Sequence, residues 1–238
     1  MPITLGGGIT VGPSIEIGSV AAPTLLLQLD AQNYSGSGTS WAAGPGTAAT
    51  LFNTPTHTAA SPTFFSFDKN SVEYATVPDL GSLSTWTVEA WYRVTTSLTG
   101  QVTSIVCNQY NLSTSLNFSI GTNQAPTNYN VTVGYYQSAW YNTAGFVPSL
   151  NTWYYTVGTY DGATLSQYNN GTLGNTLATA VTPASGGEVR IARRWDSLDS
   201  STQNFFPGDI AVVRIYSGAK SAATISNDWN GQKARFGY

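Results

Sequence analysis

One carboxylate, Glu89, stands among aromatic and small apolar residues in the stretch WTVEAWYRV at residues 86–94. A glycosidase needs two carboxyl groups, ~5 Å apart in retaining enzymes and farther apart in inverting ones. On a strand, such a pair occupies positions i and i+2 or i+4, because those side chains share a face. Thr87, Trp91 and Arg93 fill these positions. Glu89 therefore lacks an acidic partner on its own strand.

A basic residue on a neighbouring strand would give Glu89 a structural role instead. We predict that Arg214, in the middle of the strand-like stretch AVVRIY, is its cross-strand ion-pair partner. A guanidinium beside a carboxylate is expected to lower the pKa of the carboxyl group, whereas a general acid needs a raised one. We therefore expect no enzymatic activity. A glycoside hydrolase is the alternative, and substitution of Glu89 by Gln tests it.

Other catalytic and metal chemistries lack the residues that they need. The chain has one Cys and one His, Cys107 and His57, which excludes an intrachain disulfide and a structural zinc site. A Ser-His-Asp triad would have to use His57, and no nucleophile-elbow sequence accompanies it. We expect no metal centre and no cofactor.

The composition indicates a folded, nearly neutral protein. Only 9% of the 238 residues are charged, 13% are aromatic, and the net charge is −3. Without a basic stripe to neutralise phosphates, nucleic acid is not an expected partner. No apolar run approaches the ~20 residues of a membrane span. The first cation is Lys69, so we expect no secretory signal at the N-terminus.

A long stretch without any charged residue, residues 94–160, contains the candidate binding residues. Its segment NYNVTVGYYQSAWYNTAGF (residues 128–146) interleaves aromatic with amide side chains, which suit the apolar faces and hydroxyls of sugars or a protein interface. Alternation along a strand makes Tyr135 and Tyr136 face opposite ways, and half of these rings would be core. The candidate carbohydrate-binding residues are Asn130, Tyr136, Trp140, Tyr141 and, in a rim loop, Trp195.

Short strands separated by turns dominate the pattern from residue 24 onward. Leu25, Leu27 and Leu29 alternate in TLLLQLDA, and Asp161-Gly162 and Asn170-Gly171 supply the tight turns of a three-stranded meander. In residues 208–217 we expect Ala211 to share a face with Val213 and Ile215. One short helix follows a Ser221 cap. This pattern predicts an all-β, two-sheet antiparallel sandwich.

Four ordered blocks resemble those of laminin G-like domains, which belong to the concanavalin A-like lectin/glucanase superfamily. They are FFSFDKNSVEYATVPD, STWTVEAWYRV, WYYTVGTYDGATLSQYNNGTL and FFPGDIAVVRIYSGAKSAATI. The resemblance covers residues 24–238 and implies a jelly-roll sandwich. Some relatives bind Ca²⁺ at the rim, but in the first block only Asp68 and Glu73 remain of the acidic residues. Calcium prefers six to eight oxygen ligands, so a calcium site is not supported.

Residues 1–23 differ from the sandwich at residues 24–238 and form a separate, Gly-rich segment. Three interpretations compete: an unstructured leader, a first strand of the sandwich, or an arm that adds a strand to a neighbouring protein. Pro13 confines any strand here to an edge. For an assembly arm, the contact residues would be Ile9, Val11, Ile15 and Ile17.

The missing signal and the arm together suggest a virus particle. A chain opening MPITLGGGITVG and ending in a laminin G-like domain also resembles structural proteins of tailed phages. Our leading hypothesis is a non-catalytic protein of the virion surface, in capsid decoration or on a tail or fibre. It would contact other virion proteins through residues 1–23, form a homo-oligomer on the particle, and bind a host glycan. A free or cell-surface carbohydrate-binding module is the main alternative.

Overall fold

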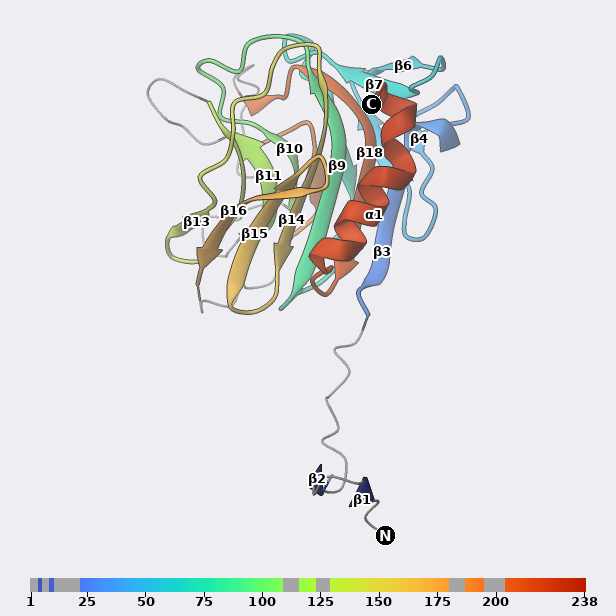
Figure 1. Cartoon of the computed structure of the whole chain (residues 1–238). Coiled ribbons are helices and arrows are strands. Elements are labelled where there is room, and N and C mark those ends of the chain that lie inside the picture. The colour runs from blue at the N-terminus through green and yellow to red at the C-terminus, as the bar shows by residue number, and fades with distance from the viewer. Residues whose placement is uncertain are drawn as a thin grey trace.

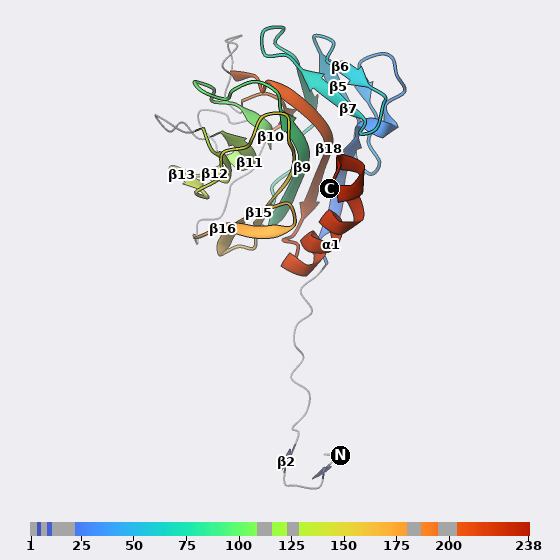
Figure 2. The same cartoon turned by 45° about the horizontal axis from the view of Figure 1, so that its top comes forward.

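The structure, a computed structural model, describes residues 4–5, 9–10, 22–108, 116–122, 129–179, 187–194 and 204–238. Two antiparallel sheets pack face to face, and one helix, α1 (Ala222–Gln232), lies on the outside of one of them (Figures 1 and 2). The predicted jelly-roll sandwich with a short C-terminal helix is confirmed. We call the two layers the helix-backed sheet and the opposite sheet.

The helix-backed sheet runs in the order β16 (Thr172–Ala178), β15 (Thr164–Asn169), β14 (Trp153–Tyr160), β9 (Trp86–Val94), β18 (Gly208–Ser217), β7 (Phe64–Phe67) and β6 (Thr56–Thr58), and β3 (Thr24–Asp30) also pairs with β18. The opposite sheet runs in the order β13 (Trp140–Asn142), β12 (Val131–Tyr136), β11 (Leu116–Thr122), β10 (Ser104–Asn108), β17 (Val189–Ile191), β8 (Tyr74–Val77), β5 (Ala49–Phe52) and β4 (Ser40–Trp41). Short 3-10 turns occur at Ala31–Asn33 and Lys233–Phe236.

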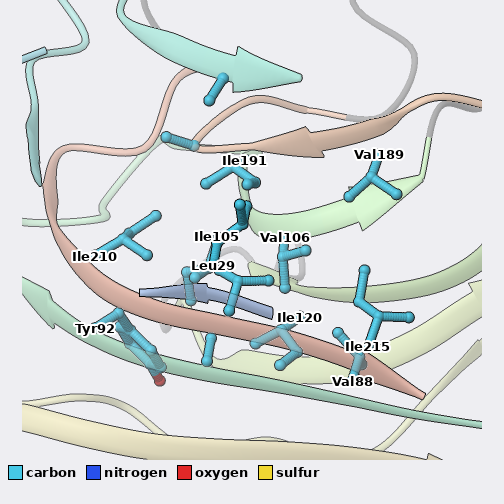
Figure 3. Packing of buried hydrophobic residues seen from close by; sticks show 14 of the residues in the cluster. Leu29, Val88, Tyr92, Ile105, Val106, Ile120, Val189, Ile191, Ile210 and Ile215 are labelled. Atoms are coloured by element: carbon cyan, nitrogen blue, oxygen red, sulfur yellow. The ribbon is translucent and has the colours of Figure 1, made fainter. Parts of the chain in front are cut away.

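The main core lies between the two sheets. Side chains of the helix-backed sheet, among them Val88, Tyr92 and Ile215, meet Val106 and Ile120 of the opposite sheet there (Figure 3). All five residues are fully buried or nearly so. Alternation then sends the intervening side chains to the two outer faces, where Glu89, Tyr136 and Trp140 lie.

Local turn chemistry sets the meander of β14, β15 and β16. Gly162 follows β14 with a φ of 99°, and Asn170 and Gly171 join β15 to β16 with φ values of 51° and 77°. Glycine and asparagine adopt such positive φ angles with little strain. The predicted hairpins are confirmed at both turns.

Helix α1 begins where the sequence predicts. The Ser221 hydroxyl accepts a hydrogen bond from the Thr224 amide at 3.2 Å, which satisfies one of the unpaired donors of the first turn. The helix packs through Ile225 on the outer face of the helix-backed sheet. Its role as a cover for one sheet explains why a single short helix suffices.

One expectation for β18 is wrong. Ala211 belongs to the small cluster beneath α1 together with Val212, not to the core that holds Val213. The register against β9 passes from Ile210 directly to Val212, so Ala211 is the extra residue of a bulge. A bulge interrupts the period of two on which the expectation rested.

The N-terminal segment is described only in part. β1 (Thr4–Leu5) pairs with β2 (Ile9–Thr10) as a separate two-stranded sheet. Ile9 of the predicted arm falls in β2, whereas Val11, Ile15 and Ile17 lie outside the described residues. The role of residues 1–23 stays a prediction.

Candidate functional site

Glu89 lies on the outer face of the helix-backed sheet, beneath α1, and is only 1% exposed. Arg214 stands directly opposite it in the register of β9 and β18, with 3.6 Å between its Nη1 and Oε2 of Glu89. A closer partner is Lys220, whose ammonium group donates to Oε1 of Glu89. Lys220 also donates to Oδ2 of Asp228 at 2.8 Å. Two basic and two acidic side chains therefore meet at one site, in which Glu89 and Lys220 are buried and Arg214 and Asp228 are partly exposed.

The expected direction of the Glu89 pKa is wrong. Burial raises the pKa of Glu89 above its usual value, although Lys220 and Arg214 oppose the increase. Desolvation disfavours the charged carboxylate, and here it outweighs the attraction of the cations. The pKa of Lys220 is also raised: its burial would lower the pKa, but the charge of Glu89 and the hydrogen bonds to Asp228 and Glu89 prevail.

Glu89 is shielded from solvent. The helix that carries Asp228 lies over it, and on the same sheet face Trp91 stacks with Trp229 of the helix and with Phe236, with 3.8 Å between the ring centroids of Trp91 and Phe236. A general acid has to come within hydrogen-bond reach of its substrate, and a substrate would have to displace this cover. Sequence reasoning found Arg214 but missed Lys220. Lys220 is not part of a strand, so no strand register could have paired it with Glu89. The one sequence signal for Lys220 is its position immediately before the helix cap.

The outer face of the opposite sheet is a second candidate surface, because α1 does not cover it. Its inward-pointing residues form a continuous apolar row in the core, so the alternate row points outward. This outer row has one residue from each strand, and most of its members are small and uncharged: Asn142, Gly134, Ser119, Cys107, Arg190, Thr76, Thr50 and Ser40.

The side chains in the middle of this row are buried, whereas those at its two ends are accessible to solvent. Cys107 and Arg190 are 0% and 4% exposed, and Arg190 Nη1 donates to the carbonyl of Arg194 at 3.2 Å. At the β13 end, the side chain of Asn142 lies over Gly134, where a Cβ would come within 1.8 Å of Asn142 Oδ1. A ligand could therefore contact this face at its ends.

An aromatic pair occupies the β12–β13 end. Tyr136 and Trp140 are direct cross-strand partners, and their ring centroids are 5.1 Å apart. Tyr136 is two residues from Gly134 of the outer row, so the side chains of Tyr136 and its partner Trp140 both belong to the outer face. Trp140 is 44% exposed, whereas Tyr135 is fully buried, as alternation predicts. We call Tyr136, Trp140 and Asn142 the aromatic platform.

The structure places the other predicted binding residues apart from the platform. Tyr141 turns to the inner face and stacks on Tyr135, with centroids 5.0 Å apart. The side-chain amide of Asn130, just before β12, donates to the carbonyl of Ala144, just after β13, at 3.0 Å. Trp195 lies outside the described residues. Of the five candidates, the platform brings together two.

Sequence reasoning missed a second aromatic pair, at the β5–β8 end of the same face. Phe52 and Tyr74 stack with centroids 4.5 Å apart and planes 3° from parallel, and Phe52 is 36% exposed. The guanidinium carbon of Arg193 lies 4.5 Å from the centroid of the Tyr74 ring. No local motif marks this pair, because 21 residues separate its members.

The rim calcium seen in some laminin G-like domains does not fit the residues present. A polar cleft of about 480 Å³ is lined by Asp68, Glu73 and Asp209, but each carboxylate already accepts internal hydrogen bonds. Glu73 accepts the Asp68 amide at 2.7 Å, Asp68 accepts the Asn70 amide at 2.9 Å, and Asp209 binds Arg93. Across the described ranges, His, Cys, Asp and Glu form no group of three arranged to hold a metal ion.

Comparison with known families decides the classification. The laminin G model of the concanavalin A-like lectin/glucanases superfamily matches residues 68–226. The chain belongs to this superfamily. The match includes β9, β18 and most of the two sheets. No curated protein matches this chain in sequence.

Solved structures support the same fold for this lectin-like domain. Domain 4 of AbnA, a GH43 extracellular arabinanase from Geobacillus stearothermophilus solved in complex with arabinotriose, superposes with a TM-score of 0.64 at 16% identity over 86% of this chain and 98% of that chain. The botulinum neurotoxin serotype C1 binding domain gives 0.63 at 13% identity over 87% and 52%. Trypanosoma rangeli sialidase gives 0.62 at 13% identity over 90% and 34%. The domain thus spans about a third of the sialidase and half of the toxin chain.

In the part of the chain that the structure describes, no helix has both the length and the hydropathy to cross a membrane.

Proposed function

We propose that this chain is a non-catalytic carbohydrate-binding protein whose glycan site is the aromatic platform. The observation that carries the proposal is the pairing of Trp140, 44% exposed, with Tyr136 at a ring separation of 5.1 Å on the outer sheet face. Exposed indole rings stack on the apolar faces of sugars, and the Asn142 amide beside them can both donate and accept hydrogen bonds. Membership of a lectin-containing superfamily supports the same assignment.

The charge distribution favours a neutral glycan at this platform. Residues 94–160 contain no Asp, Glu, Lys or Arg, so β12 and β13 have no charge of their own. A ligand bound at the platform would therefore be held by stacking on the aromatic rings and by hydrogen bonds to amide side chains. The structural likeness to AbnA domain 4, whose solved complex holds arabinotriose, makes a pentose oligosaccharide the first ligand to test.

The experiment is a glycan array with the full chain, followed by calorimetry with arabinotriose and with each array hit. We expect binding to one glycan class, and Trp140→Ala should weaken it at least tenfold, about 1.4 kcal/mol. Leu150→Ala is the matched control, because Leu150 is 50% exposed in a rim loop away from the platform. Absence of any hit, or equal affinity of Trp140→Ala and the wild type, would refute the proposal.

We place this binding protein on a virion surface, with residues 1–23 as the arm that joins it to other virion proteins. The support is the Gly-rich composition of that segment and its resemblance to phage structural proteins. All strands of the two large sheets lie within residues 24–238. Deletion of residues 1–20 should therefore leave a folded sandwich that no longer enters particles. Normal incorporation of the deletion variant into particles would contradict the arm.

A further inference from the structure

The edges of the two sheets differ sharply in length. β13, β4 and β6 end their sheets with three, two and three residues. Very short edge strands are one way in which proteins prevent edge-to-edge pairing. β16, the remaining end of the sheet order, has seven residues, Thr172–Ala178.

The other seven-residue strand at a border, β3, is covered. The Gln28 amide donates to the carbonyl of Pro45 at 3.0 Å, the Gly44 amide donates to the carbonyl of Gln28 at 2.8 Å, and Leu29 bridges to Ala43. The segment 43–45 thus occupies the edge that β18 leaves free. Among the described residues, β16 pairs with one strand, β15, and Figures 1 and 2 both show it at the outer border of its sheet.

β16 also lacks the chemical protection that natural edges have. Its sequence, TLGNTLA, contains no charged residue and no proline, and the uncharged stretch extends from residue 162 to residue 187. Five of its seven residues are exposed, and the other two are half-buried. Gly174 forms one bulge against β15, which leaves Asn175–Ala178 in regular pairing. Lysine, inward-pointing charged side chains and proline are the residues that usually prevent another strand from pairing with such an edge.

We propose that β16 is a self-association edge, which pairs antiparallel with β16 of a second copy of this chain. The two helix-backed sheets would then join into one continuous sheet across a two-fold axis. Such an interface is isologous, so the same strand supplies both halves. Because β16 is uncharged, no like charges meet across the axis. This inference does not depend on glycan binding.

A second copy suits this edge better than the N-terminal segment does. A strand added to an edge donates backbone N–H groups, and Pro13, in the middle of residues 9–17, has none. Glu16 would bring a charge to the pair. β16 itself supplies seven residues with an N–H and no charge.

Sedimentation equilibrium of the full chain over a concentration series tests the proposal. The weight-average mass should rise from 25.2 kDa toward twice that value. Thr176→Lys should weaken the association at least tenfold without changing the far-UV circular dichroism or the melting temperature, because Thr176 is an exposed side chain. Thr96→Lys, the same change on an exposed loop, should associate like the wild type.

Single cysteines along the strand supply an independent test. Thr172→Cys, Thr176→Cys and Ala178→Cys each add a thiol on β16, and the native Cys107 is fully buried. Oxidation should give a covalent dimer most efficiently at the position nearest the two-fold axis. A monomer at all concentrations with no cross-link overturns the proposal. So does a dimer that Thr176→Lys leaves intact, or one that deletion of residues 1–20 abolishes.

Discussion

Replacement of Glu89 by Gln is the most informative perturbation of the buried charge site. Gln is nearly isosteric with Glu, so the substitution removes a charge without leaving a cavity. Lys220, whose side chain is 7% exposed, loses one of its two acidic partners. Arg214 loses its ion pair but keeps its hydrogen bond to Gln232 at 2.9 Å. Both cations stay partly satisfied in the variant.

The expected loss of stability is therefore below the range for a broken buried pair. Removing one partner of such a pair costs about 3–5 kcal/mol. Asp228 remains 2.8 Å from Lys220, and the uncharged Gln removes the desolvation cost that raises the pKa of Glu89, so we expect a loss of about 1 kcal/mol for Glu89→Gln. That corresponds to a fall in melting temperature of about 2–4 °C, at 2–4 °C per kcal/mol for a chain of this size.

Urea unfolding followed by circular dichroism measures the loss. Asp79→Asn is the control, because this exposed side chain keeps an oxygen to accept the Gly81 amide, and we expect a change within about 0.5 kcal/mol. The double variant Glu89→Gln/Lys220→Met should be more stable than Lys220→Met alone, since it no longer buries an acid without its closest partner. Hydrolysis of arabinan or a sialoside by the wild type, lost in a Glu89→Gln variant of unchanged stability, would refute the structural role.

Two further predictions concern single sites elsewhere. Burial raises the pKa of Glu73, so the folded state holds the proton of this carboxyl group more tightly than the unfolded state does. The wild type should therefore lose stability relative to Glu73→Gln as the pH rises from 4 to 7. A difference between their urea midpoints that stays constant over this range contradicts the prediction. Gly171→Ala should be clearly less stable than Gly36→Ala in thermal unfolding, because both glycines have positive φ but a Cβ at Gly171 would come within 2.8 Å of the Trp229 ring, whereas Gly36 faces open space. Equal losses would show that backbone strain alone acts.

Features with a local cause could be predicted from the sequence. The Asn170-Gly171 hairpin follows from the positive φ that its turn needs, and the Ser221 cap from the unpaired amides of a first helical turn. The alternation of Tyr135 and Tyr136 follows from the period of a strand. Each of these depends on neighbours within a few residues.

Features with a distant cause could not be predicted. Lys220 meets Glu89 from 131 residues away, and Phe52 meets Tyr74 across two strands. The Ala211 bulge depends on how β18 fits against β9. The Glu89 pKa had the opposite direction from the one expected because the sequence shows a neighbouring charge but not the helix that excludes water. Burial is a property of the packed chain.

The position of β18 has a consequence for synthesis. Strand β18 lies between β9 and β7 in the sheet, so these two strands have no shared partner until residues 208–217 have been made, and the acid at the centre of β9 meets its lysine only when residue 220 has been made. A nascent chain that has not yet reached residue 208 therefore has an open sheet and an uncompensated carboxylate. We expect stop codons before residue 208 to abolish folding of the sandwich.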